Sequence, residues 1–350
     1  MTHTLYQQQH KQAEWHRLAV APMMGWTDRH CRFFHHCLAP SAVLYSEMVT
    51  ADAIRFGNHH RLLHQTSAGT TILQLGGCDP RALAEAVSLA ETYEYNYAGY
   101  NLNAGCPSPR VQNGGFGACL METPNLAAEL VAAMKTANPH KPISVKCRIG
   151  VDDMDTMTGL DRFAEAVIGA GADYLIVHAR RAILGGLNPK QNRTIPPLDY
   201  GRVYALKQRL GGYPVVINGG LAGVADVREA LANVDGVMLG RVAYQRPRVL
   251  WQVASAVSGH ASPELSQVIE TMAEYVRDEI KNGTPLIAIT RHMLGLGAGL
   301  CGGRRWRRML SEEARTNPDD TTLIMRAWDG LAKQAIPETK QPAQPIERAA

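Results

Sequence analysis

The strongest constraint on the fold is a pattern of short apolar runs that recur along the chain. Each run has the length of a strand and is bounded by Gly, Pro or polar residues, as buried strands are. Eight such runs occur, at 18–23, 42–48, 71–76, 99–103, 143–148, 174–179, 214–219 and 236–241. Their apolar character predicts strands that are covered on both faces.

Segments with helical periodicity, many of them rich in Ala, separate several of these runs. They lie at 80–92, 126–137, 160–169 and 224–232, and Thr27-Asp28 is suited to cap a further helix that ends near Leu38. Alternating strands and helices predict parallel β/α units, and eight units predict a closed barrel. The expected fold class is therefore α/β, a (β/α)8 TIM barrel with a C-terminal all-helical domain.

Polar or functional side chains fall at the same end of these runs. Seven residues lie in the last positions of a run or just after it: Met23, Gln74, Cys106, Lys146, His178, Asn218 and Arg241. The carboxyl ends of the strands form one face of a barrel, and that face carries the active site in barrels of this kind. The pattern therefore predicts a site built from these side chains.

Cys106 stands in the stretch Asn101-Leu102-Asn103-Ala104-Gly105-Cys106-Pro107-Ser108. Gly105 and Pro107 end strand pairing on either side of it, which would present the thiol at a strand tip. A lone intracellular cysteine is also often a small core residue. From this stretch alone, a catalytic and a structural role stay equally open.

A functional role is better supported for three other side chains because they share this position at the ends of the runs. Lys146 follows an otherwise apolar run, and a lysine buried there is expected to face a polar or anionic ligand. His178 alone would favour a core histidine, but beside Lys146 and Cys106 it favours function. Gln74 can donate and accept at once, which suits the edge of a flat heterocycle.

Glycines close the last two runs. Asn218-Gly219-Gly220 and Gly240-Arg241 stand where barrels of this kind commonly hold a phosphate on backbone N–H groups. Ordinary turns after strands are the alternative interpretation. The position of both turns favours a phosphate site in which Arg241 supplies a charged clamp.

Four regions are expected along the chain. They are a flexible N-terminal segment (1–17), the barrel (18–258), a helical domain (259–336) and a disordered tail (337–350). The helical domain should contain a helix at 264–280 and a glycine-interrupted helix at 290–314. Its basic point is Arg304-Arg305-Trp306-Arg307-Arg308, where four Arg around a Trp suggest a surface that binds nucleic acid.

Composition narrows the functional classes. The 350 residues carry a net charge of +4, too small to indicate nucleic-acid binding by itself. Seven scattered cysteines without a Cys-x-x-Cys pair suit a reducing compartment and indicate no zinc site, and the His pairs lack further ligands, so no metal is assigned. We expect a cytoplasmic monomer with no membrane segment and no obligate protein partner.

Seven segments of the chain resemble the tRNA-dihydrouridine synthases. They are Ala21-Pro22-Met23, Gln74-Leu75-Gly76, Asn101 to Pro107, Val145-Lys146-Cys147-Arg148, His178-Ala179-Arg180, Asn218-Gly219-Gly220 and Gly240-Arg241. Three further segments are similar to the A-type bacterial branch, which acts on uridines 20 and 20a of the tRNA D-loop. These are Trp26-Thr27-Asp28-Arg29-His30, Lys190 to Arg193 with Ile195 to Tyr200, and Arg291-His292-Met293-Leu294-Gly295-Leu296.

The resemblance implies an FMN enzyme that reduces the C5–C6 double bond of uridine with NADPH. It implies that Ala21, Pro22 and Met23 back the flavin and that Gln74 and Lys146 bond its polar edge. Asn218, Gly219, Gly220, Gly240 and Arg241 would hold its phosphate, and His178 would bridge flavin and substrate. Cys106 would be the proton donor, because a thiol is mostly protonated at neutral pH yet able to give up its proton.

The resemblance also implies five tRNA contacts, which are Asn103, Lys190, Arg193, Arg305 and Arg308. Two other functions stay open. One is an FMN barrel oxidoreductase that acts on a small pyrimidine, as dihydroorotate dehydrogenases do, although such an enzyme would not need the arginine-rich domain. The other is an RNA-binding protein whose barrel is inactive, which the presence of Cys106, Lys146 and His178 argues against.

Overall fold

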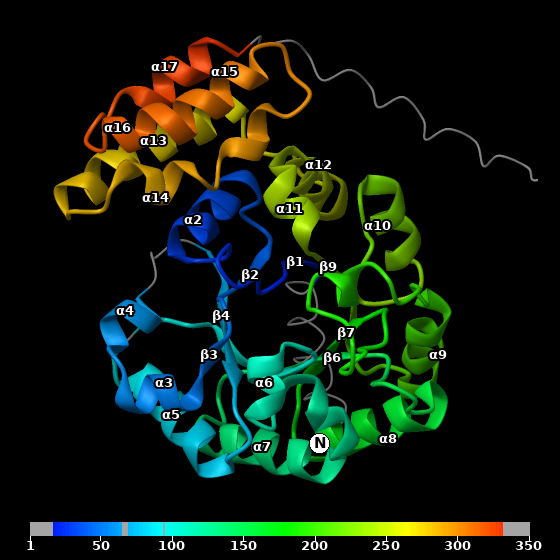
Figure 1. Cartoon of the computed structure of the whole chain (residues 1–350). Coiled ribbons are helices and arrows are strands. Elements are labelled where there is room, and N and C mark those ends of the chain that lie inside the picture. The colour runs from blue at the N-terminus through cyan, green and yellow to red at the C-terminus, as the bar shows by residue number, and fades with distance from the viewer. Residues whose placement is uncertain (1–16, 65–68, 94, 332–350) are drawn as a thin grey trace, which may run out of the picture.

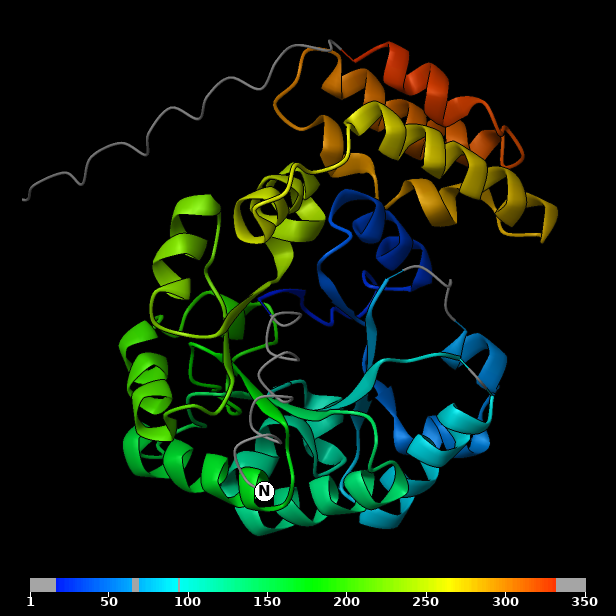
Figure 2. The same cartoon turned by 180° about the vertical axis from the view of Figure 1, so that it is seen from behind.

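A closed barrel of parallel strands forms the body of the molecule (Figures 1 and 2). The computed structural model describes residues 17–64, 69–93 and 95–331. The sheet order is β2-β1-β9-β8-β7-β6-β5-β4-β3, and a pairing between β2 and β4 closes the ring. The strands are β1 (Leu18–Val20), β2 (Val43–Tyr45), β3 (Val49–Thr50), β4 (Thr71–Gly76), β5 (Gly99–Ala104), β6 (Ile143–Arg148), β7 (Tyr174–His178), β8 (Val215–Asn218) and β9 (Gly236–Leu239).

The predicted TIM barrel is confirmed, with one difference in the second predicted strand. Only Val43–Tyr45 of the run 42–48 form a strand, β2, and the two-residue β3, which pairs only with β4, follows after the end of the run. The chain leaves the ladder at Ser46, whose hydroxyl donates to the carbonyl of Glu47 at 2.7 Å. The same hydroxyl oxygen accepts from the backbone N–H of Gln74 at 2.9 Å, so a side chain replaces the ladder bond there.

Helices cover the outside of the barrel, and aspartates cap several of them. Asp28, Asp79, Asp155 and Asp199 each accept backbone N–H groups of the first turn, as N-cap residues do. The helices up to the end of β9 are α2 (Arg29–Leu38), α3 (Ala51–Phe56), α4 (His59–Leu63), α5 (Pro80–Thr92), α6 (Pro109–Asn113), η2 (Gly117–Glu122), α7 (Pro124–Ala137), α8 (Thr156–Gly169), η3 (Gln191–Arg193), α9 (Tyr200–Leu210) and α10 (Val224–Leu231). After β9 come α11 (Arg241–Gln245) and α12 (Pro247–Ser258).

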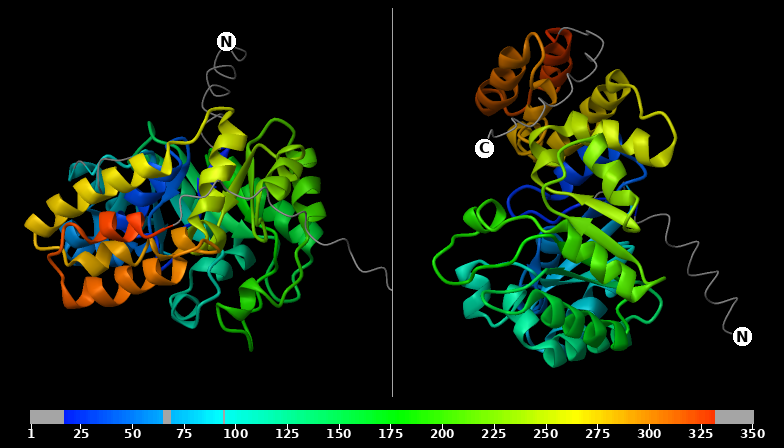
Figure 3. Two further views of the ribbon diagram at one scale, coloured as in Figure 1. Left: turned by 90° about the horizontal axis from the view of Figure 1, so that it is seen from above. Right: turned by 90° about the vertical axis from the view of Figure 1, so that its right-hand side faces the viewer.

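The remaining helices, which we call the C-terminal helices, lie beside the barrel next to α2 (Figure 3). They are α13 (Leu265–Lys281), α14 (Leu286–Thr290), η4 (Leu294–Gly297), α15 (Gly303–Arg308), η5 (Met309–Glu313), α16 (Ala314–Thr316) and α17 (Leu323–Asp329). The expected glycine-interrupted helix over 290–314 is divided into several short ones. Gly299 and Gly302, in the break between η4 and α15, adopt left-handed backbone angles.

Three clusters of buried side chains form the core. The largest lies between the sheet and the outer helices, and a smaller one fills the barrel interior around Tyr45 and Tyr174. The hydroxyls of these two tyrosines hydrogen-bond to each other at 2.8 Å. The third cluster joins the C-terminal helices to Phe34 and Leu38 of α2. Helix α2 thus packs against both the barrel and the C-terminal helices.

Two expectations fall outside the described residues. Almost all of the flexible N-terminal segment (1–17) and all of the disordered tail (337–350) lie there. Within the described residues, every helix is too short or too polar to cross a membrane.

Candidate active site

The strand register brings the predicted side chains to two successive levels near the barrel mouth. Asn103 of β5 pairs with Lys146 of β6, and His178 of β7 pairs with Asn218 of β8. Arg148, at the end of β6, pairs with His178. Neighbouring strands therefore place an amide, two cations and an imidazole side by side.

Cys106 lies half-buried in the turn that follows β5, and hydrogen bonds fix that turn on both sides. Its backbone N–H donates to Asn103 Oδ1 at 3.0 Å, and the N–H of Gly105 donates to the same oxygen at 3.1 Å. The carbonyl of Cys106 accepts from the N–H of Ala118 at 3.0 Å. A Cβ at Gly117 would lie 2.6 Å from that carbonyl oxygen, so only glycine allows this close approach.

A row of buried amides runs beside the cysteine turn. Gln74 Nε2 donates to Asn101 Oδ1 at 2.7 Å, and Asn103 Nδ2 donates to Gln74 Oε1 at 2.9 Å. Asn101 Nδ2 in turn donates to Ser144 Oγ at 2.9 Å. Each amide nitrogen carries a second hydrogen, so Gln74 and Asn103 keep one donor each for a ligand.

The mouth is strongly electropositive. Burial, with the neighbouring Arg148, lowers the pKa of Lys146 to about 8. Burial, with Arg148 and Lys146, holds the pKa of His178 well below its usual value, so the imidazole is neutral. Burial also lowers the pKa of Arg148 to about 10. Among the described residues, no carboxylate forms an ion pair with any of these three groups.

The glycine turns after β8 and β9 form a cradle of the kind that a phosphate occupies. Gly219 and Gly220 adopt left-handed backbone angles, with φ of +109° and +74°. A Cβ at Gly240 would meet nothing within 4 Å, so open space lies in front of that turn. Arg241 borders the turn and donates to the carbonyl of Arg193 at 3.2 Å. Asn218 fixes the cradle from inside, because its Nδ2 donates to the carbonyl of Met238 at 2.7 Å.

These observations test whether a flavin mononucleotide fits the mouth. His178 Nδ1 is buried without a hydrogen-bond partner among the described residues, which leaves a polar atom for a ligand. The glycine cradle and Arg241 suit a phosphate, and Lys146 suits an electron-rich ring edge. The residues present therefore fit an anionic, flat cofactor.

The end of β1 completes the mouth. The N–H of Ala21 donates to the carbonyl of Leu239 at 2.8 Å, which aligns β1 with β9. The N–H of Met23 donates to Thr27 Oγ1 at 2.9 Å, and the N–H of Thr27 donates to the carbonyl of Met23 at 3.0 Å. Ala21, Pro22 and Met23 therefore form a rigid wall rather than a free loop.

Two residues of this site were missed by the sequence analysis. Arg148 donates to the carbonyl of Gly105 at 2.8 Å, of Arg181 at 3.1 Å and of Asn192 at 3.0 Å. The fully buried Asn192 binds four backbone groups of residues 183–188. Arg148 and Asn192 thereby tie the cysteine turn to the loop that exposes Lys190 and Arg193. The hint in the sequence was a second cation, two positions after Lys146 on the same apolar strand.

The arginine-rich helix differs from expectation in one respect. Arg304, Arg305, Arg307 and Arg308 are all exposed, as a nucleic-acid surface requires. Trp306 is fully buried instead and donates from Nε1 to the carbonyl of Met293 at 3.0 Å, so the interpretation of this Trp as part of a binding surface is wrong. Its apolar partners at helical spacing, Met309 and Leu310, could have indicated a core position.

Beside this helix lies a groove of about 470 Å³, lined in part by Arg304, Arg307 and Arg308. The described residues contain no group of three or more His, Cys, Asp or Glu side chains that could hold a metal ion.

Known proteins agree with this architecture. Residues 19–327 match the family model described as "Dihydrouridine synthase (Dus)". A protein of Xanthomonas campestris named tRNA-dihydrouridine(20/20a) synthase is 50% identical over 320 residues, which cover 91% of this chain and 95% of that protein.

Proteins with the same name from Vibrio cholerae and Escherichia coli K12 are each 46% identical. The alignments cover 91% and 89% of this chain, and 98% and 90% of those proteins. The matched span includes the cysteine turn, the electropositive mouth, the glycine cradle and the arginine-rich helix, and the chain therefore belongs to the dihydrouridine synthase family.

Proposed function

We propose that this enzyme reduces uridines 20 and 20a of the tRNA D-loop to 5,6-dihydrouridine, with FMN as its cofactor and NADPH as its reductant. The relatives named for this reaction support the substrate. The observation that carries the proposal is the position of Cys106, which lies half-buried in a turn fixed at the mouth of the barrel. Beside it stand a cationic Lys146 and a neutral His178.

Cys106 supplies the proton in this proposal. When bound, the reduced flavin supplies a hydride for C6 of the uracil ring. The charge that develops on C5 and the adjoining carbonyl is then quenched by the Cys106 S–H proton, which forms the second C–H bond. Two electrons and two hydrogens are added, and the thiolate regains its proton from solvent.

The other residues of the mouth bind and orient. Asn218, Gly219, Gly220, Gly240 and Arg241 would hold the phosphate, and Ala21, Pro22 and Met23 would form the wall behind the ring. Gln74 and Lys146 would bond the polar edge of the ring. His178 would lie between cofactor and substrate, where its neutral imidazole can both donate and accept.

The tRNA contacts divide into two groups. Asn103 would touch the target nucleotide, because its amide keeps one donor free at the level of Lys146. Lys190, Arg193, Arg305 and Arg308 would bind backbone phosphates from exposed positions on a loop and a helix. Phosphate binding has to offset the few kcal/mol that extracting a stacked base costs.

The proposed organisation is an FMN-binding barrel over 18–258 and a tRNA-binding helical domain over 259–336, in a cytoplasmic monomer. No Gly-x-Gly-x-x-Gly motif follows a strand in the sequence. NADPH and tRNA therefore take turns at the same face of the flavin.

The test is a single turnover. The purified enzyme is reduced by light, unmodified tRNA is added without oxygen, and flavin absorbance and nucleoside mass are followed. Flavin reoxidation with a gain of two daltons at positions 20 and 20a is the expected result. A flavin that ignores tRNA but is reoxidised by a free pyrimidine would instead establish the small-molecule oxidoreductase.

A further inference from the structure

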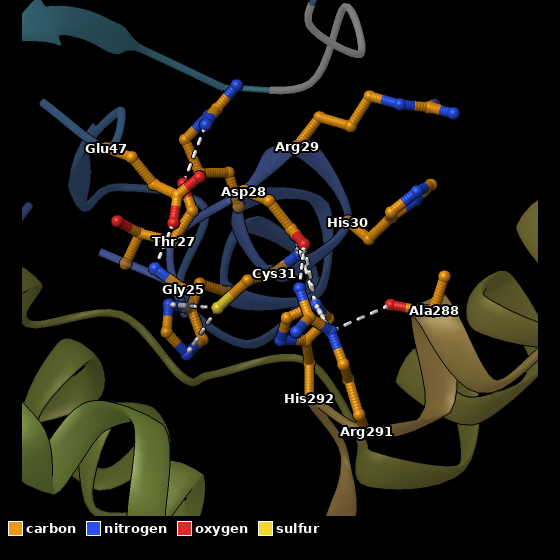
Figure 4. Close-up of polar contacts among 12 residues, drawn as sticks. Gly25, Thr27, Asp28, Arg29, His30, Cys31, Glu47, Ala288, Arg291 and His292 are labelled. Carbon is orange, nitrogen blue, oxygen red and sulfur yellow. Dashed lines mark hydrogen bonds and ion pairs between the residues drawn. The ribbon is translucent and has the colours of Figure 1, made fainter. Parts of the chain in front are cut away.

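Two segments that resemble the A-type branch, 26–30 and 291–296, meet although they lie more than 260 residues apart (Figure 4). Asp28 caps α2 and bonds both Arg291 and His292. Arg291 Nη2 lies 2.5 Å from Asp28 Oδ2, and His292 Nε2 lies 3.0 Å from Asp28 Oδ1. The contact therefore links the helix that follows β1 to the segment between α14 and η4.

A second contact joins the same helix to α13. The guanidinium of Arg29 forms a two-pronged ion pair with Glu279, in which Nη2 and Oε2 lie 2.5 Å apart. Thr284 Oγ1 donates to Glu279 Oε2 at 2.7 Å. Tyr275, on the same face of α13, lies with its hydroxyl 2.6 Å from His30 Nδ1 and stacks on Phe33 with ring centres 4.0 Å apart.

A third contact comes from α11, directly after β9. Tyr244 stacks on Trp26 with ring centres 4.4 Å apart and meets the edge of His292 at 5.7 Å. A Cβ at Gly295 would lie 2.4 Å from the carbonyl oxygen of Gln245, so the 291–296 segment approaches α11 more closely than any other residue would allow.

The barrel side of these contacts is continuous with the candidate flavin site. Met23, the last residue of the flavin-backing wall, is held to Thr27 by hydrogen bonds in both directions. Thr27 directly precedes Asp28. A displacement of Asp28 relative to the wall would break these bonds, so the two move as one body.

The other side is continuous with the arginine-rich helix. Trp306, in the middle of α15, donates to the carbonyl of Met293 at 3.0 Å, one residue after His292. A Cβ at Gly297 would lie 2.9 Å from the Trp306 ring. Thr290 Oγ1 donates to the carbonyl of Leu310 at 2.7 Å, which adds a second tie beyond α15.

We propose that Asp28, Arg29, Glu279, Arg291 and His292 form an interlock that fixes the span between Cys106 and the arginine-rich helix, and thereby selects which D-loop nucleotide enters the barrel. This inference rests on the proposed function. A tRNA held by its phosphates on α15 presents to the mouth the nucleotide that lies at the matching distance. The five residues are positioning residues, since they touch neither the cofactor cradle nor the cysteine turn.

The Asp28 carboxylate of the interlock is charged throughout the neutral pH range. Although burial opposes ionisation, hydrogen bonds from His292 and the N–H of Cys31 hold the pKa of the Asp28 carboxyl well below its usual value. Burial lowers the pKa of the adjacent His30 to about 4, so this ring is neutral and adds no competing charge. Asp28 therefore keeps the negative charge with which it meets Arg291 at neutral pH.

The test removes single charges while keeping the fold. Asp28→Asn retains an N-cap side chain, and Glu279→Gln retains the shape of its partner. The double exchange Arg29→Glu with Glu279→Arg restores an ion pair in reverse. Glu85→Gln, which removes an exposed pair with Arg55 on the outer barrel helices, is the matched control.

Each variant is assayed for the ratio of dihydrouridine at positions 20, 20a and neighbouring D-loop uridines, and for the KM for tRNA. The rate of flavin reduction by NADPH is the internal control. We expect both single variants to raise the KM for tRNA about tenfold, the equivalent of about 1.4 kcal/mol of binding, and to shift the position ratio, because α15 is then displaced from the mouth. Flavin reduction should be unchanged, the exchange should restore the ratio, and Glu85→Gln should resemble the wild type.

One result would overturn the inference. It is a position ratio and a KM that stay at wild-type values in folded Asp28→Asn and Glu279→Gln proteins, even with a lower melting temperature. If Asp28→Asn does not fold, the position ratio and the KM for tRNA of Glu279→Gln and of the Arg29→Glu with Glu279→Arg double variant decide between the two outcomes. A wild-type enzyme that makes no dihydrouridine would instead refute the proposed function itself.

Discussion

The side-chain oxygen of Asn103 accepts the backbone N–H of Cys106 at 3.0 Å, so the last polar residue of β5 shapes the turn that presents the thiol. The same amide donates to Gln74 at 2.9 Å. Asn103 thus connects the thiol that would deliver a proton with the amide that would face the flavin.

Replacing Asn103 by alanine removes both the acceptor that holds the cysteine turn and a substrate contact. We expect Asn103→Ala to lower the rate of uridine reduction by about 100-fold, because displacing a reacting group by about 1 Å costs that much. Flavin reduction by NADPH should stay near the wild-type rate. Asn101→Ala, which also removes a buried amide beside Gln74, is the control for general loosening. Equal losses in the two variants would argue against a specific role for Asn103.

Replacing Cys106 by alanine removes the proposed proton donor and little else, because the turn is held through backbone atoms. Cys106→Ala should retain bound FMN and oxidise NADPH, yet form no dihydrouridine in a single turnover. Stopped-flow absorbance and nucleoside mass spectrometry follow the two half-reactions separately. Dihydrouridine formed at the wild-type rate would reject Cys106 as the acid.

The barrel and its mouth were predictable because local sequence patterns specify both. Apolar runs with a helix between them specify β/α units, and the closed register then pairs Asn103 with Lys146 and His178 with Asn218. Strand ends were less predictable where a side chain replaces a ladder bond, as Ser46 does between β2 and β3.

Contacts between distant segments could not be inferred from local patterns. Asp28 and His292 are adjacent only because α2 packs against the C-terminal helices, and neither residue's neighbours in sequence indicate the other. The buried Arg148 was also missed, because its partners are backbone carbonyls, which leave no trace in the sequence. Both were overlooked for the same reason: their partners are set by the tertiary fold.

The glycine cradle can be tested by adding a single methyl group. A Cβ at Gly240 would meet no protein atom within 4 Å, although the ψ of −121° lies outside the regions that other residues usually adopt. Gly240→Ala should therefore fold with a modest loss of stability and bind FMN at least tenfold more weakly, because the methyl group enters the space assigned to the phosphate. Gly169→Ala, on the outer helix α8 with equally open space, is the control. FMN affinity is measured by titrating the ligand-free proteins. If Gly240→Ala binds FMN as tightly as the wild type, the phosphate does not bind at this turn.

The exposed arginines of α15 should contribute through charge rather than shape. Arg305→Ala and Arg308→Ala should each weaken tRNA binding and reduce the slope of log affinity against log salt by about 1. Arg162→Ala, an exposed arginine on the outer barrel helix α8, should leave both unchanged. Binding is measured by fluorescence anisotropy at several salt concentrations. If the α15 variants keep the wild-type slope of log affinity against log salt, this helix does not bind the tRNA phosphates.

Lys146 gives the ligand-free enzyme a defined dependence on pH. Burial, with Arg148, lowers its pKa to about 8 from 10.5. The cationic form that would attract the flavin edge is therefore lost as pH rises through about 8, and FMN affinity should fall by up to tenfold per pH unit above it. Lys146→Met should bind FMN weakly, with little change between pH 7 and 9.5. Parallel pH profiles for the two proteins would show that another group governs binding.

The same shift predicts the opposite trend for the stability of the ligand-free fold. Between pH 8 and 10.5 the unfolded chain carries a proton on Lys146 that the folded chain has lost. Because stability rises with pH wherever the unfolded state binds more protons, the lysine destabilises the fold most below pH 8. Relative to Lys146→Met, the wild-type free energy of unfolding should therefore increase by about 2 kcal/mol between pH 7.5 and 9.5. Urea titrations of both proteins at these two pH values measure this change. If the difference in free energy of unfolding between the two proteins is the same at both pH values, Lys146 keeps its proton in the folded state.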